Sequence, residues 1–207
     1  MPIKVVPVVL EGKTIRLEPL ALSHGPGLMD QATAETFRFF GGAIVQKATP
    51  EGIQSYIETR LALHDVLSFA ITLRENGEAV GHTSFMNIRP KDRVLEIGST
   101  WIGENYRGTR VNPESKFLML RQAFEVWGCV RVELKTDERN LQSRRAIAKL
   151  GAVQEGILRK HMVAADGHIR NTVMFSILDE EWPAVKTQLE DRLKLRDPWG
   201  RIVAAPS

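Results

Sequence analysis

The order of strand-like and helix-like segments limits the fold of this chain more than any other feature. Three strand-like runs follow one another in the middle of the sequence, over 68–73, 79–88 and 94–102. Asn76-Gly77 lies between the first two runs, and this dipeptide between apolar strands is a strong hairpin signal. The middle of the chain therefore predicts consecutive antiparallel strands.

The second half of the chain alternates helices with strands. Helices are expected over 113–128 and 140–150, with a strand over 130–136 between them. Two hairpin strands, over 152–163 and 169–178, are expected around Asp166-Gly167, and a last helix is expected over 180–195. Antiparallel strands followed by this alternation predict an α+β protein with a mixed sheet and helices on both faces. No repeat or Pro/Gly/Ser-rich linker divides the sequence, so one domain is expected over 1–207.

The N-terminal part predicts a hairpin and two helices. Strands are expected over 5–10 and 14–20, and a helix is expected over 24–32. A Phe-rich mobile loop follows over 34–42. A second helix is expected from residue 50 onward, with Thr49 as its N-cap and Pro50 as its first residue. Phe37, Phe39 and Phe40 in the loop either line an acceptor pocket or pack in the core, and the sequence leaves both open.

Composition narrows the class of partner. The 207 residues are 43% hydrophobic and 26% charged, which is ordinary for a globular protein. The net charge of +3 suits an anionic cofactor or substrate but is too small to predict nucleic-acid binding. No apolar run approaches the ~20 residues of a membrane helix, so no membrane partner is expected.

Cysteine and histidine usage points to a cytoplasmic protein without a catalytic metal. The lone Cys129 cannot form an internal disulfide, fits a reducing cytoplasm and is expected to be a small buried hydrophobe. The five histidines show no spacing typical of metal ligands.

A strand-to-helix connection after Trp101 is the first candidate site. A helix is expected to begin there with Asn112 as N-cap and Pro113 as its first residue. Its unpaired amides and positive dipole end favour an anion, Arg107 and Arg110 add charge, and Gly108 permits close backbone approach. An ordinary capped turn with solvated arginines explains the same residues equally well.

Two further segments contain candidate binding or catalytic residues. Asn140 and Ser143 open the helix after the strand 130–136, either as an N-cap and third helical residue or as ligand-binding groups. Glu96 lies in the middle of a largely apolar strand. It either points to a solvated face of the sheet or acts as a general acid–base group.

Together these pieces resemble the GCN5-related N-acetyltransferases (GNAT), and within them the RimJ/RimL-like branch. The resemblance covers roughly 13–193 and rests on five segments: Glu96-Ile97-Gly98-Ser99-Thr100-Trp101-Ile102, Tyr106-Arg107-Gly108-Thr109, Lys135-Thr136-Asp137-Glu138-Arg139-Asn140-Leu141-Gln142-Ser143-Arg144, Leu150-Gly151-Ala152 and Glu155-Gly156-Ile157-Leu158-Arg159. It implies the acyl-CoA N-acyltransferase fold, whose sheet splays between its fourth and fifth strands to admit the pantetheine of acetyl-CoA.

The resemblance also implies roles for individual residues. The pyrophosphate is expected on the loop and helix start formed by Arg107, Gly108, Thr109, Arg110, Val111 and Asn112. Asn140 and Ser143 are expected along the pantetheine, and backbone amides around Trp101 and Ile102 are expected to polarise the thioester carbonyl.

The catalytic assignments follow from the same resemblance. Glu96 is expected to act as the base. Ser143 is expected to protonate the leaving thiolate, because neither Tyr56 nor Tyr106 falls where many relatives place a tyrosine for this task.

One departure from the family pattern concerns the pyrophosphate loop. The family commonly has Arg/Gln-x-x-Gly-x-Gly/Ala, whereas this chain has Arg110 and Asn112 at the two small positions. Arg110 either reaches a phosphate oxygen itself or obstructs the site. A non-catalytic CoA-binding module is therefore the alternative to an enzyme, and a small RNA-binding protein is a weaker one.

The predicted activity is transfer of acetyl from acetyl-CoA to a primary amine. The acceptor is either a protein N-terminal α-amino group or a small-molecule amine, and its choice is expected to depend on the loops 34–42 and 164–170. Relatives are often dimers, so the resemblance also implies a homodimer.

Overall fold

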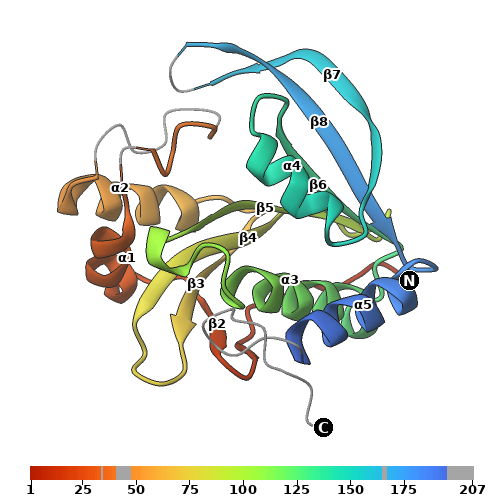
Figure 1. Ribbon diagram of the computed structural model, residues 1–207, viewed down its shortest axis with the longest axis horizontal. Helices are drawn as coiled ribbons and strands as arrows, with labels where there is room; N and C mark the ends of the chain where they lie inside the picture. Colours follow the sequence, from red (N-terminus) through yellow and green to blue (C-terminus); the bar gives the residue numbers. More distant parts are fainter. Residues whose placement is uncertain (34, 41–47, 165–166, 195–207) are drawn as a thin grey trace, which may run out of the picture.

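The computed structural model describes residues 1–33, 35–40, 48–164 and 167–194. Within them, an eight-stranded sheet has the order β1-β2-β3-β4-β5-β6-β8-β7 (Figure 1). The strands are β1 Leu10–Glu11, β2 Ile15–Pro19, β3 Leu67–Leu73, β4 Ala79–Arg89, β5 Val94–Ile102, β6 Arg131–Asp137, β7 Val153–Val163 and β8 Ile169–Leu178. Only β5 and β6 are parallel among these neighbours, so the predicted mixed sheet is confirmed.

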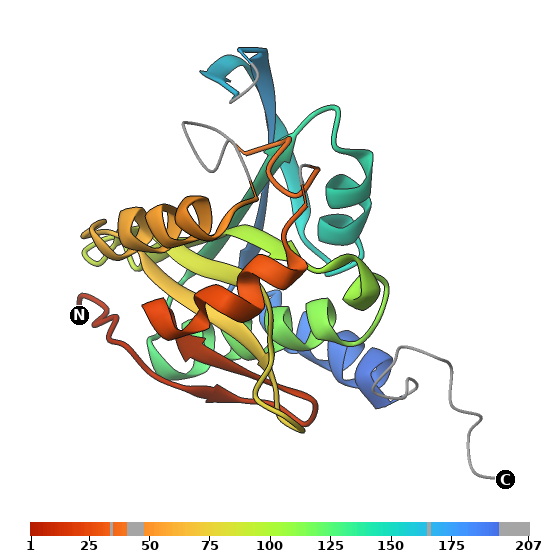
Figure 2. The same cartoon turned by 90° about the vertical axis from the view of Figure 1, so that its left-hand side faces the viewer.

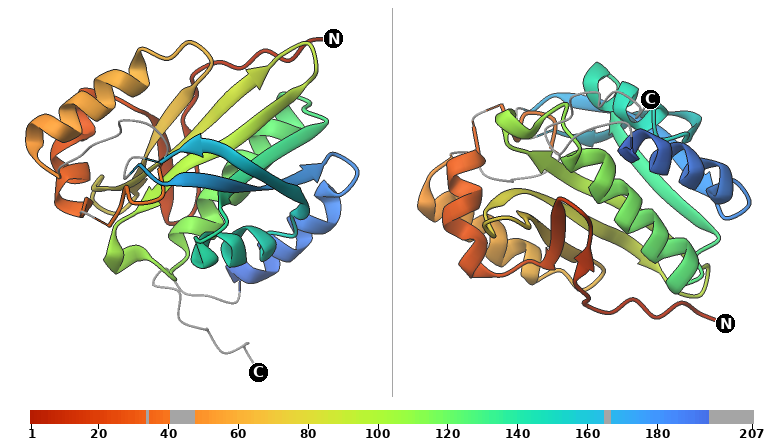
Figure 3. Two further views of the ribbon diagram at one scale, coloured as in Figure 1. Left: turned by 90° about the horizontal axis from the view of Figure 1, so that it is seen from above. Right: turned by 60° about the horizontal axis from the view of Figure 1, so that its bottom comes forward.

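Helices cover both faces of this sheet. They are α1 Gly25–Gln31, α2 Pro50–Leu61, α3 Val111–Arg121, α4 Leu141–Ala148 and α5 Trp182–Lys194. Successive strand residues face opposite sides. On β3, Phe69 and Ile71 belong to the cluster with α3, α4 and α5, whereas Ala70 packs with α1 and α2. Figure 2 shows α1 and α2 together, and Figure 3 shows α3 beside α5.

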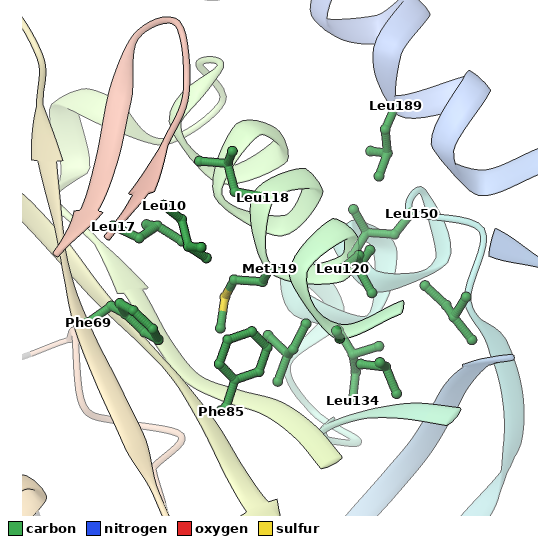
Figure 4. Packing of buried hydrophobic residues seen from close by; sticks show 14 of the residues in the cluster. Leu10, Leu17, Phe69, Phe85, Leu118, Met119, Leu120, Leu134, Leu150 and Leu189 are labelled. Carbon is green, nitrogen blue, oxygen red and sulfur yellow. The ribbon is translucent and has the colours of Figure 1, made fainter. Parts of the chain in front are cut away.

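The larger core lies between α3 and the sheet. Leu118, Met119 and Leu120 of α3 are buried there together with Phe69 and Phe85 from the strands (Figure 4). The two Phe rings meet edge to face with centroids 5.8 Å apart. Because its apolar side chains share one buried cluster with residues from most strands, α3 is fixed against this face of the sheet, and this positions the residues at its start.

The short-range signals in the sequence explain several elements. Gly77 adopts a φ of 75°, as the turn between β3 and β4 requires, and the predicted hairpin is confirmed. Thr49 caps α2 by accepting a hydrogen bond from the Gly52 amide at 3.1 Å. The hairpin of β7 and β8 is also confirmed, although Asp166 of its turn lies outside the described residues.

Two elements differ clearly from those predicted. Of the expected strand 5–10 only Leu10 pairs, since Pro7 lacks an amide donor and no strand of the described residues pairs with 5–9. The expected helix 113–128 begins earlier, at Val111, and changes into a π-helical turn over Gln122–Val126. The Phe-rich loop 34–42 falls partly outside the described residues.

Candidate active site

The two parallel strands at the centre of the sheet diverge. β5 and β6 pair only at Val94–Arg131, Leu95–Val132 and Glu96–Glu133. Beyond these pairs β5 continues to Ile102 and β6 to Asp137 without pairing with each other. The resulting gap, called the splay below, runs roughly 20 Å along β5 from Glu96 to Ile102 at the usual rise per strand residue.

A bulge in β5 lies beside the splay. Trp101 pairs with His82 and Gly98 with Ser84, so Ser99 and Thr100 together face the single residue Thr83. The Gly103 amide donates to the Val80 carbonyl of β4 at 2.9 Å. Because amide direction alternates along a strand, the Ile102 amide faces away from β4, toward the splay.

The first candidate loop connects β5 to α3. Gly108 has a φ of 77°, and a side chain on it would meet open space, so the backbone is accessible there. The Thr109 hydroxyl accepts a hydrogen bond from the Val111 amide at 3.3 Å and donates to the Tyr106 carbonyl at 2.6 Å. The loop is therefore well defined up to the first helical residue.

The helix start differs from the prediction. Arg110, not Asn112, is the N-cap residue, because its carbonyl accepts the first helical hydrogen bond from the Glu114 amide at 2.9 Å. Asn112 and Pro113 lie within the first turn, where amides have no helical partner and proline is tolerated. The expected amides at a helix start after β5 are present, two residues earlier than predicted.

Arg107 is tied to the end of β5. Its Nε donates to the Ile102 carbonyl at 3.2 Å, and a guanidinium nitrogen lies 3.4 Å from a Glu104 carboxylate oxygen. The side chain remains about one-third exposed. It therefore both fixes the loop and leaves positive charge at the helix start.

The second candidate loop connects β6 to α4. Asn140 is the N-cap, and its Oδ1 accepts a hydrogen bond from the Ser143 amide at 3.0 Å, so Ser143 is the third helical residue. β5 and β6 are parallel, so the loops after them lie at the same edge of the sheet. The structure thus brings Arg107–Asn112 and Asn140–Ser143 to one end of the splay.

Glu96 lies at the narrow end of the splay and is 2% exposed. The interpretation that it points to a solvated face is therefore wrong. Its Oε2 lies 2.9 Å from Lys135 Nζ and accepts a hydrogen bond from Asn87 Nδ2 at 2.7 Å. Both donors contact the same oxygen, and among the described residues none donates to Oε1.

Gly98 keeps space beside that oxygen. A Cβ at position 98 would sit 2.8 Å from Glu96 Oε1 and 2.7 Å from Met86 Sδ, closer than a real Cβ contact. Glycine at this place therefore leaves the carboxylate in its position.

Sequence reasoning missed the polar groups around Glu96. Lys135 and Asp137 lie on the same side of β6 as each other, and Arg139 makes two side-chain hydrogen bonds to the buried Asp137 carboxylate at 3.1 and 2.9 Å. Partial burial, with Lys135 and Arg170 nearby, lowers the pKa of His161. The alternation of charged and uncharged residues along 131–137 was the available signal.

The Phe-rich segment contributes both to the core and to the polar residues near Glu96. Phe37 is buried and packs edge to face against Trp101, with centroids 5.6 Å apart. The Phe39 carbonyl accepts a hydrogen bond from Arg170 at 3.1 Å. No hydrogen bond between described residues joins Glu96 to Ser143, so the two proposed catalytic groups are separate.

Comparison with known proteins decides the family. The family model described as an acetyltransferase (GNAT) domain matches residues 14–153, about two-thirds of the chain. The chain belongs to the GNAT family. The GNAT fold predicted from the sequence is thereby confirmed, and the splay between β5 and β6 corresponds to the one expected between the fourth and fifth strands of the family.

Individual GNAT relatives agree with this assignment. An uncharacterised N-acetyltransferase of Mycobacterium tuberculosis is 30% identical over 129 residues, which cover 59% of this chain and 81% of the relative. A GCN5-related N-acetyltransferase from Brucella melitensis has a TM-score of 0.88 and 32% identity, covering 97% of this chain and 93% of its own. A ribosomal-protein-S5-alanine acetyltransferase from Vibrio fischeri shares the fold, with a TM-score of 0.69, 18% identity and coverage of 84% and 98%.

No group of three or more His, Cys, Asp or Glu side chains is placed to hold a metal ion in the part of the chain that the structure describes. No described helix is both long and apolar enough to cross a membrane.

Proposed function

We propose that this GNAT protein transfers acetyl from acetyl-CoA to a primary amine, with residues of about 13–193 forming its one catalytic domain. The observation that carries the proposal is the splay, which places two helix starts at one end and a buried carboxylate at the other. Such a gap suits a long donor with a phosphate-bearing end and a reactive end.

The residues at the wide end fit an acyl-CoA. The amides at the start of α3 and the charges of Arg107 and Arg110 favour a pyrophosphate, and the open space at Gly108 allows it to approach the backbone. Thr109 and Val111 shape this loop, and Asn112 presents an amide in the first turn. Asn140 and Ser143 flank the same entrance from the other strand and would contact the pantetheine.

The residues within the splay fit a thioester. The Ile102 amide and the bulge before the buried Trp101 offer backbone donors that would polarise a carbonyl oxygen, in the manner of an oxyanion hole. Ser143 lies in the first turn of α4, where its hydroxyl would protonate the departing thiolate.

The proposed chemistry is direct transfer without a covalent enzyme intermediate. The amine nitrogen attacks the thioester carbonyl, so that a C–N bond forms and the C–S bond breaks. The nitrogen, starting as an ammonium, loses two protons in all, the thiolate takes up one, and one is released. Glu96 accepts a proton from the nitrogen, directly or through a water, since its Oε1 has no donor among the described residues.

The acceptor is a protein N-terminal α-amino group or a small-molecule amine. The fold shared with the S5-alanine acetyltransferase and the RimJ/RimL-like motifs support the former. We further propose a cytoplasmic protein, which the buried, unpaired Cys129 supports, and a homodimer.

The first test measures CoA binding and thiol release separately. CoA at ~100 times its Kd should stabilise the fold by roughly 2.7 kcal/mol. Acetyl-CoA with a pool of amines should release thiol and give acetylated amine. Unchanged melting with CoA would refute acyl-CoA binding, whereas binding without turnover would favour the alternative, a non-catalytic CoA-binding regulatory module.

The second test concerns the proposed acid. Ser143→Ala should lower kcat by ~10- to 1,000-fold and leave CoA affinity nearly unchanged, because only the leaving step loses a proton donor. The matched control is Ser55→Ala, which removes an exposed hydroxyl from α2. A folded, CoA-binding Ser143→Ala protein with full turnover would return Ser143 to a structural role at the helix start.

A further inference from the structure

A buried lysine lies beneath the bulge of β5. Lys116 is in the middle of α3 and is 6% exposed. Its Nζ donates to Thr100 Oγ1 at 2.6 Å and lies 3.4 Å from Thr83 Oγ1. The two threonine hydroxyls are also 2.8 Å apart, so Lys116 joins α3 to both strands at the bulge.

No carboxylate of a described residue pairs with this amine. Its hydrogen-bond partners among the described residues are hydroxyl groups, and no ion pair of Lys116 occurs there. Burial lowers the pKa of Lys116 to about 7. A buried amine without a counterion costs stability, and a methionine would fill the same space at lower cost. Packing alone therefore does not explain a lysine at this position.

The opposite face of the bulge is held as well. Ser99 has a φ of 49°, a conformation that costs a non-glycine residue free energy. His82 Nδ1 lies 2.9 Å from the Ser99 carbonyl and 2.8 Å from the Tyr56 hydroxyl. The bulge is thus fixed between a histidine on the α2 side and Lys116 on the α3 side.

The geometry points to a role for Lys116 in the reaction. We propose that Lys116 is a positioning residue for acyl transfer: through Thr100 it fixes the bulge of β5, and in its protonated form it stabilises the negative charge that develops on a carbonyl oxygen bound by the adjacent backbone amides. This inference rests on the proposed function. A charge placed under preorganised amides acts strongly because water is excluded from the site.

The principal variant is Lys116→Met, which keeps the unbranched side chain up to about the position of Cε and removes its charge and donors. We expect kcat to fall ~10- to 1,000-fold, KM for acetyl-CoA to stay within ~3-fold, and the melting temperature to be unchanged or higher. The control is Lys91→Met in the exposed turn between β4 and β5, which should match the wild type. A purely structural lysine predicts the reverse, a lower melting temperature with unchanged kcat.

A binding measurement gives an answer that does not depend on turnover. Acetonyl-CoA, a non-hydrolysable ketone analogue, presents the carbonyl that CoA lacks. We expect the wild type to bind it more tightly than CoA and Lys116→Met to lose most of this preference. If Lys116→Met fails to fold, Thr100→Val, which removes the hydroxyl that accepts from Lys116, should reduce both kcat and the preference in the same direction.

The outcomes separate the two proposals. A wild type that neither binds CoA nor releases thiol would refute the proposed function. A wild type that does both, with variants that retain full kcat and the full preference for acetonyl-CoA, would overturn the role of Lys116.

Discussion

The cost of burying Lys116 can be measured from the pH dependence of stability. Lys116→Met removes a group whose pKa falls from its ordinary 10.5 to about 7 because α3 and the sheet bury it. Between these pH values the unfolded chain binds a proton that the folded protein does not. Stability therefore rises with pH in this window and is lower below it.

The magnitude follows from the two pKa values. At about 1.4 kcal/mol per pH unit, the full difference from 10.5 to about 7 corresponds to about 5 kcal/mol. Over the experimentally convenient range from pH 7 to pH 9, the wild type should gain about 2.5 kcal/mol from this group. Lys116→Met should not show this gain.

Urea unfolding at several pH values measures the difference directly. The quantity to compare is the unfolding free energy of the wild type minus that of Lys116→Met, because all other titrating groups then cancel. This difference should become more favourable to the wild type as the pH rises. Parallel curves for the two proteins would show that Lys116 keeps an ordinary pKa, and the burial argument would be refuted.

Three further predictions concern other parts of the site. Gly98→Ala should lower kcat by ~10-fold or more, because the new Cβ displaces the Glu96 carboxylate; equal kcat in steady-state assays would contradict this. Arg110→Ala should weaken CoA binding roughly tenfold in calorimetry, more so at low salt, and tighter binding would show that Arg110 obstructs the site. Arg139→Ala should cost ~1–3 kcal/mol at pH 7 in urea unfolding. Burial raises the pKa of Asp137, but the hydrogen bonds from Arg139 lower it below its usual value, and the variant loses these bonds. The stability that the ionised Asp137 carboxylate contributes above its pKa is then lost. Acid unfolding identical to that of the wild type would contradict this prediction.

Local signals in the sequence predicted most of the fold. Asn76-Gly77 located the hairpin of β3 and β4, and Asn140 marked the start of α4. These residues act through their own backbone conformation or a nearby hydrogen bond, so a single sequence reveals them. Burial of Cys129 was predicted because a free cysteine behaves as a small hydrophobic residue, and it is confirmed.

Features that depend on partners distant in the sequence were predicted less well. The apolar residues 5–9 resemble a strand, but no strand in the part of the chain that the structure describes pairs with them. The start of α3 moved because the Thr109 hydroxyl and the Arg110 carbonyl, not the Asn112 side chain, meet the first amides.

The same limit applies to the candidate site. Glu96 was selected from its position in a strand, but its contacts with Lys135 and Asn87 arise from neighbouring strands. Lys116 looked like an ordinary helical lysine, since nothing near it in sequence reveals that Thr83 and Thr100 lie above it. Predicting such a group requires the sheet register, including the bulge at Ser99.

Acetyl transfer itself is the most direct test of the account. Purified protein would be incubated with acetyl-CoA and N-terminal peptides, amino acids, polyamines or aminoglycosides, while free thiol is followed by a colorimetric reagent and products by mass spectrometry. The account predicts one acetylated amine for each thiol released, with Glu96→Gln strongly impaired. Absence of any acetylated amine across these acceptors, from protein that binds CoA, would contradict it.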